Sequence, residues 1–155
     1  MLAPPDDNDP CAWHVYFAKT ANNRAWELSV EPRDPAGDRE MLDAAHASAW
    51  HWQVAGSELH RMRSAMLLAE VHAAVGHGAT AMRHARPMRD YFLGKADTPD
   101  WEIAFAQLVY AHAAHAAGDL AAYRKAYDEA TSAVARIADP EDRDVVLQSL
   151  RQVPA

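Results

Sequence analysis

The sequence has 155 residues, a length that suits a single domain with its own hydrophobic core. Half of the residues are hydrophobic and 24% are charged, which excludes an extensively disordered chain. The formal net charge of −7 at pH 7 excludes nucleic-acid or anionic-membrane binding driven by overall charge. Alanine occurs 34 times, against 10 valines and 2 isoleucines, so the composition favours helices over β-sheets.

Cysteine content and the N-terminal residues bear on the compartment. The single cysteine, Cys11, cannot form a disulfide or a cysteine-based zinc site within one chain. The first residues lack the basic and apolar segments of a signal peptide, and no apolar run approaches the ~20 residues that span a bilayer. These features predict a cytoplasmic protein without membrane contact. The excess of 12 arginines over 3 lysines, with the many alanines, favours a bacterial source.

Residues that start and stop helices recur at regular intervals. Asp-Pro pairs, which supply an N-cap and a proline for the first turn, stand at 9–10, 34–35 and 139–140. Further starts are expected at Ser57, Thr98-Pro99 and Asp119, and glycines that end helices stand at 56, 76, 94 and 118. The pattern predicts helices over about 10–30, 35–56, 58–76, 79–92, 99–118, 120–137 and 140–153.

Two of these helices show an apolar stripe, and one contains a proline. In 99–118 the stripe consists of Trp101, Phe105, Leu108, His112 and His115, and in 120–137 it consists of Tyr123, Tyr127, Ala130, Val134 and Ile137. Pro87 lies inside the fourth predicted helix. Because it lacks a backbone N–H, it is expected to kink that helix.

A short repeat occurs at a spacing of 42 residues. Residues 69–76 (AEVHAAVG) align with residues 111–118 (AHAAHAAG), and an amphipathic helix follows each block. Small alanine side chains allow helices to approach closely. The repeat therefore predicts two helix–turn–helix units, over 57–93 and 99–137, packed side by side.

Both units, over residues 57–137, resemble the tetratricopeptide repeat, the second of them through Ala117, Gly118, Asp119, Tyr127 and Ala130. In the first unit, the residues at the spacing of that motif are Leu68, Ala69, His72, Gly76, Ala81 and Met88. Ala65 and Ala114 stand where the motif has larger aromatic residues. The resemblance implies a right-handed superhelix of stacked antiparallel hairpins with a concave partner-binding groove, capped by the C-terminal helix. Residues 45–52 also resemble bacterial all-helical proteins of uncharacterised function.

Nine histidines include candidates for metal or ligand binding. His112 and His115 are three residues apart, so their rings project from one side of a helix. Together with a carboxylate such as Glu70 or Glu102 they would suit Zn²⁺. No spacing in the sequence is a defined ligand signature, so the primary expectation is that no metal is bound. The metal candidates are His46, His51, His112 and His115.

Aromatic residues are the second group of candidates. Trp50 and Trp52 are two residues apart and point about 160° away from each other on a helix. They cannot both face one core, so one of them is expected at a groove or a partner subunit. The predicted binding residues are Trp50, Trp52, Trp101, His46, His51, His72, His112 and Tyr91.

Together these features predict one all-α domain over 1–155, with 1–9 as a disordered tail and about seven antiparallel helices. The predicted function is a non-catalytic helical-repeat module that binds a protein or peptide, needs no cofactor and self-associates as a homo-oligomer. Nucleic acid and membranes are not expected partners. The alternative is a metal- or small-ligand-binding helical protein, an enzyme included, that uses the histidines around the tryptophans.

Overall fold

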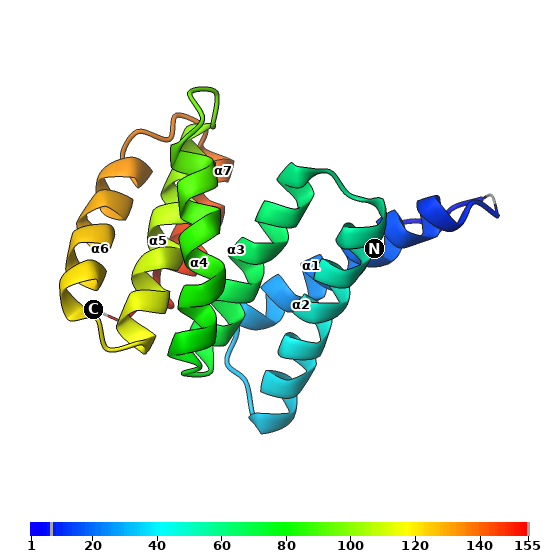
Figure 1. The fold of residues 1–155 in the computed structure, drawn as a ribbon, viewed down its shortest axis with the longest axis horizontal. Helices are drawn as coiled ribbons and strands as arrows, with labels where there is room; N and C mark the ends of the chain where they lie inside the picture. The colour runs from blue at the N-terminus through cyan, green and yellow to red at the C-terminus, as the bar shows by residue number, and fades with distance from the viewer. Residues whose placement is uncertain (7, 155) are drawn as a thin grey trace.

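The computed structural model describes residues 1–6 and 8–154, which form seven α-helices and no strand (Figure 1). The predicted all-α class is therefore confirmed. Residue 155 of the expected 1–155 domain and residue 7 of the expected 1–9 tail lie outside the described residues. The helices are α1 (Pro10–Val30), α2 (Pro35–Ala55), α3 (Glu58–Ala74), α4 (Gly78–Leu93), α5 (Asp100–Ala116), α6 (Leu120–Val134) and α7 (Pro140–Leu150). The predicted sixth and seventh helices were each about three residues too long.

The three Asp-Pro pairs cap helices as expected. Asp9, Asp34 and Asp139 each accept a backbone N–H in the first turn of the helix that follows, and the proline occupies an early helical position. The start expected at Thr98-Pro99 is confirmed, because α5 begins at Asp100, but Thr98 does not cap the helix. Its hydroxyl donates instead to the carbonyl of Phe92 at 2.6 Å, which ties the loop back to the end of α4 and leaves α5 without a side-chain cap.

The 42-residue repeat corresponds to two turns of the same geometry. Gly76 and Gly118 have φ values of 79° and 78°, a left-handed conformation that favours glycine. After the first glycine, the His77 N–H donates to the His72 carbonyl at 2.8 Å. After the second, the Asp119 N–H donates to the Ala114 carbonyl at 2.9 Å. These are the bonds of a Schellman motif, so the repeat encodes how α3 and α5 end.

Pro87 lies on the exposed side of α4, and the helix runs through it from Gly78 to Leu93. Gly78, at the first turn of α4, is packed against the end of α5. A Cβ atom at that position would lie 2.3 Å from the carbonyl oxygen of Ala116. Only glycine therefore lets these two helices approach as closely as they do.

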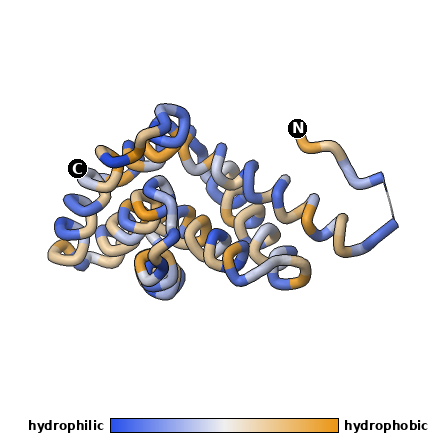
Figure 2. The backbone as a smooth tube through the Cα atoms, turned by 90° about the horizontal axis from the view of Figure 1, so that it is seen from above, coloured by the Kyte–Doolittle hydropathy of each residue, from blue (hydrophilic) through white to orange (hydrophobic). Residues whose placement is uncertain are grey.

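The helices pack mainly on their neighbours in the chain. α3 also contacts α1 and α5, and α7 contacts α5, α6 and α1, so the last helix reaches the first. α5 is buried on nearly all sides, so the single apolar stripe expected there was too narrow. Hydrophobic and hydrophilic residues alternate along the helices in Figure 2. Within the described residues, none of the helices combines the length and hydropathy required to cross a membrane.

Candidate functional site

A buried polar cluster lies where side chains of α1, α3, α5 and α7 meet. At its centre is Glu70 on α3, whose relative exposure is 4%. The Ser29 hydroxyl on α1 lies 3.5 Å from its Oε1, and the Ser149 hydroxyl on α7 also bonds to the carboxyl. Burial raises the pKa of Glu70 to about 7, although both hydroxyls and the charge of Arg33 oppose this shift. Glu70 is therefore a buried acid whose hydrogen-bond partners are neutral hydroxyls.

A cavity of about 460 Å³ lies on the His112 side of this cluster, lined in part by Ser29, Arg33, His115 and Gln152. His112 is 7% exposed, and its burial lowers the pKa to about 4, with smaller contributions from His115 and Arg33. At neutral pH its imidazole is uncharged, so one nitrogen donates and the other accepts.

A second cavity, of about 220 Å³, is lined by Glu70 and by aromatic side chains, including Trp26, Trp101 and Phe105. The Trp26 indole N–H donates to Ser149 Oγ at 3.3 Å, which links the first helix to the last. At the rim, Arg63 Nε donates to Glu102 Oε1 at 2.6 Å.

The Arg63 guanidinium also lies 5.5 Å from the centroid of the Trp101 ring. Glu102 is 3% exposed, so this ion pair joins a buried carboxylate to a half-exposed cation. The cavity thus combines aromatic walls, one paired carboxylate nearby and the carboxyl of Glu70.

The predicted residues His46 and His72 form a contact of their own. Their Nε2 atoms are 3.0 Å apart, and Nδ1 of His72 lies 3.2 Å from Nδ1 of His77. The His84 ring stacks on His72 with centroids 6.1 Å apart. Burial and these neighbouring rings lower the pKa of His72 to about 4. Both nitrogens of His72 are used within the cluster, so they do not point to one shared ligand position.

The predicted residues His51 and Trp50 lie in a different cluster, near the start of α1. Nδ1 of His51 lies 2.8 Å from Nδ1 of His14, and the Trp50 ring contacts both imidazoles. Trp50 is 60% exposed, and the exposed side chains of Phe17 and Val54 belong to the same two helices. Because Trp52 is only 6% exposed, the two tryptophans face opposite ways as helix geometry requires.

The remaining predicted binding residues are separate from one another. Trp52 stacks on His60 with ring centroids 4.1 Å apart inside the α2–α3 junction. Tyr91 is half-buried, and its hydroxyl accepts a hydrogen bond from Lys95 at 2.7 Å. Of the eight predicted binding residues, Trp101 lines the 220 Å³ cavity and His112 lines the 460 Å³ cavity, whereas the other six line neither.

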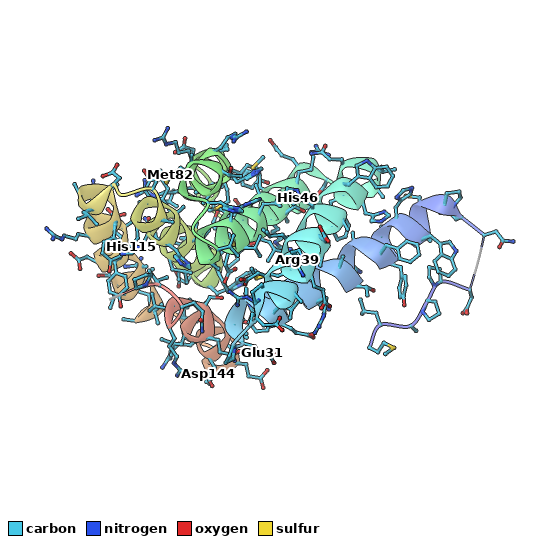
Figure 3. All side chains as sticks on the ribbon, turned by 90° about the horizontal axis from the view of Figure 1, so that it is seen from below. Glu31, Arg39, His46, Met82, His115 and Asp144 are labelled. Atoms are coloured by element: carbon cyan, nitrogen blue, oxygen red, sulfur yellow. The ribbon has the colours of Figure 1, made fainter. Side chains whose placement is uncertain are left out.

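The four metal candidates do not converge. His112 and His115 line one cavity, whereas His46 pairs with His72 and His51 pairs with His14. His46 and His115 lie well apart in Figure 3. Among the described residues, no group of three or more His, Cys, Asp or Glu side chains is placed to hold a metal ion.

A shallow groove of about 670 Å³ runs between α1 and α2, next to Trp50. Alanines form much of its floor, and charged side chains of both signs stand at its edges. Its lining residues include Phe17, Ala21, Arg24, Arg39, Glu40, Asp43, Ala44, Ala47 and His51.

Sequence reasoning named Glu70 only as a possible metal partner and missed Trp26, Ser29, Arg33 and Ser149. The alignment of 69–76 with 111–118 gives Glu70 and His112 equivalent positions, and it is a sequence signal for this region beside the candidates Trp101 and His112. No family model, characterised protein or solved structure is significantly similar to the chain, so its relation to the tetratricopeptide repeats stays a resemblance.

Proposed function

We propose that this chain is a non-catalytic helical-repeat module that binds a protein partner through the face formed by α1 and α2. In this proposal α1–α2, α3–α4 and α5–α6 are antiparallel hairpins in a right-handed, tetratricopeptide-like superhelix, and α7 is the cap. Two features support the architecture. The turns after α3 and α5 share one geometry at a 42-residue spacing, and α3 packs against both α1 and α5.

The observation that carries the proposed function is the exposure of large apolar side chains on one face. Trp50 is 60% exposed, Val54 55% and Phe17 45%. A helical stack requires a polar outer surface at its ends to remain soluble as a monomer. The α1–α2 face does not meet that requirement, and contiguous apolar surface of this kind marks interaction sites.

The partner that fits this face best is a second copy of the chain. A two-fold interface brings the same surface together from both subunits, so that surface has to be complementary to itself. The groove is lined by Arg24 and Glu40, which pair with each other at 2.6 Å, and by Arg39 and Asp43. Cations and anions on one face can pair across a two-fold axis, whereas a face of one sign would repel its copy.

Light scattering after size exclusion, from low micromolar to near-millimolar concentration, tests this proposal. The chain should form dimers, and Trp50→Ala should raise the dimer dissociation constant by roughly tenfold or more, because exposed tryptophans at interface centres contribute most. Leu120→Ala is the matched control, since Leu120 is 51% exposed but lies at the start of α6. A monomer at every concentration, or equal effects of the two substitutions, would contradict the proposal.

If the chain stays monomeric but binds a peptide or another protein, the proposed binding module would stand and the proposed self-association would be rejected. The free, exposed Cys11 is compatible with the reducing cytoplasm that we propose as its compartment.

A further inference from the structure

Glu70 is the carboxyl group among the lining residues of the 220 Å³ cavity, and it has no ion-pair partner among the described residues, whereas Arg63, which also lines the cavity, is paired with the buried carboxylate of Glu102. Glu102 is paired with Arg63 at 2.6 Å. Glu70 is hydrogen-bonded to the hydroxyls of Ser29 and Ser149. Because an ionised carboxylate without a counter-charge is costly to bury, this position favours the arrival of a cation.

Arg33 does not serve as that counter-charge. Its Nε donates to Asp38 Oδ1 at 2.9 Å, and its Nη1 donates to carbonyls at the end of α1, including that of Ser29 at 3.1 Å. Arg33 lowers the pKa of Glu70, but it affects this pKa less than burial and the two hydroxyls do. The charge of Glu70 in the cavity is therefore left to be balanced by something else.

The walls of the cavity suit an organic cation. Trp26, Trp101 and Phe105 line it, and aromatic faces attract cations, tryptophan most strongly. The Trp101 ring already has the Arg63 guanidinium 5.5 Å from its centroid. One wall thus takes part in cation–π contact at the rim, beside a buried carboxylate.

We propose that the cavity lined by Trp26, Trp101, Phe105 and Glu70 binds a small organic ammonium ion, with its charge at Glu70 and its alkyl groups against the rings. The cavity has a volume of about 220 Å³. It suits tetramethylammonium or a short alkylammonium. A carboxylate ligand would be repelled by Glu70, and a neutral alkane would leave that carboxyl without a counter-charge.

Proton release gives the proposal a second signature. Burial raises the pKa of Glu70 to about 7, so about half of the empty sites hold a proton at pH 7. An ammonium ion favours the ionised carboxylate and displaces that proton. The other charged groups near the cavity are Arg33, Arg63 and Glu102.

Isothermal titration with n-butylammonium chloride and with tetramethylammonium chloride tests the site in the full chain. We expect saturable one-site binding of at least one of these ions, with butyrate and 1-butanol binding at least roughly tenfold more weakly. Titrations at pH 7 in two buffers of different ionisation enthalpy should show release of about half a proton.

Glu70→Gln keeps the shape of the side chain and should weaken ammonium binding at least roughly tenfold and abolish the proton release. Glu129→Gln is the matched control, because Glu129 lies on α6, away from the cavity, and pairs with Arg89 of α4. Absence of ammonium binding, equal binding of 1-butanol, or an unchanged affinity in Glu70→Gln would overturn the proposal.

A measurement on the unaltered chain covers the case in which Glu70→Gln does not fold. The indole N–H resonances of Trp26 and Trp101 should shift on titration with the ammonium ion, while that of the distant, exposed Trp50 should not. Shifts of Trp50 alone would place the ion elsewhere and reject the site. The ammonium site does not depend on the proposed dimer. Trp50→Ala should therefore weaken the dimer and leave the affinity for the ammonium ion unchanged.

Discussion

Glu70 and His112 occupy equivalent positions in the 42-residue repeat, and the structure shifts their pKa values in opposite directions. The carboxyl is raised to about 7 and the imidazole is lowered to about 4, and burial is the largest cause in both cases. Both shifts favour the uncharged form. Helices α3 and α5 therefore place at the same step of the repeat an ionisable side chain whose burial favours the uncharged form, and both side chains lie near Ser29 of α1.

The first prediction concerns His112 and acid. Its folded-state pKa of about 4 lies below the unfolded value of 6.5, so the unfolded state binds more protons between these pH values. The contribution of the neutral imidazole to the free energy of unfolding is complete above pH 6.5. It falls by about 3 kcal/mol as the pH drops to about 4. His112→Gln should remove this part of the acid sensitivity. Urea unfolding at pH 7 and at pH 4.5 measures the difference, and parallel losses in both proteins would contradict the assignment.

The second prediction concerns Glu70 and has the opposite sign. Its folded-state pKa of about 7 lies above the unfolded value of 4.5, so the folded state binds more protons between these values. The stability that Glu70 contributes is present below pH 4.5 and is lost as the pH rises through 7. Relative to the parent chain, Glu70→Gln should gain about 3 kcal/mol between pH 4.5 and pH 8. Glu129→Gln, on the surface of α6, should show no such gain.

The third prediction concerns the close approach of α4 and α5 at Gly78. Because an added Cβ would lie 2.3 Å from the Ala116 carbonyl oxygen, Gly78→Ala should force the helices apart and cost about 2 kcal/mol or more. Gly37→Ala is the control, since its Cβ would meet side-chain atoms and no backbone, those of Arg33 at 3.3 Å and Asp34 at 3.4 Å. That change should be neutral or slightly stabilising, because alanine favours helix. Thermal unfolding of the two variants ranks them, and equal transition temperatures would contradict the packing.

The fourth prediction separates the two neighbouring tryptophans. Trp52 is 6% exposed and stacks on His60, so Trp52→Ala should cost about 3–5 kcal/mol of unfolding free energy. Trp50 is 60% exposed, so Trp50→Ala should change the stability of the monomer by about 0.5 kcal/mol or less. Chemical unfolding at low protein concentration is the appropriate measurement. A large loss in Trp50→Ala under those conditions would show that Trp50 belongs to the core.

The sequence predicted those features that depend on neighbouring residues. Asp34 before Pro35 starts α2, Gly76 ends the turn after α3, and the spacing of Trp50 and Trp52 places them on opposite faces. Each follows from backbone conformation or helical periodicity, which are local properties.

Features that depend on distant segments could not be predicted in this way. The four candidate histidines divide among three clusters because His46 meets His72 and His51 meets His14, contacts that depend on how whole helices are placed. The surroundings of Glu70 likewise arise only when α7 reaches α1, and nothing local to residue 149 indicates that approach.

The contact between the Trp26 indole and the Ser149 hydroxyl joins positions 123 residues apart. An array of repeats that touch only their neighbours can fray or melt one unit at a time. Here the first helix and the last are tied together, so loss of either end exposes surface belonging to the other. We therefore expect a single cooperative unfolding transition, and slower folding than local helix pairing alone would give, because a long loop has to close before this contact forms.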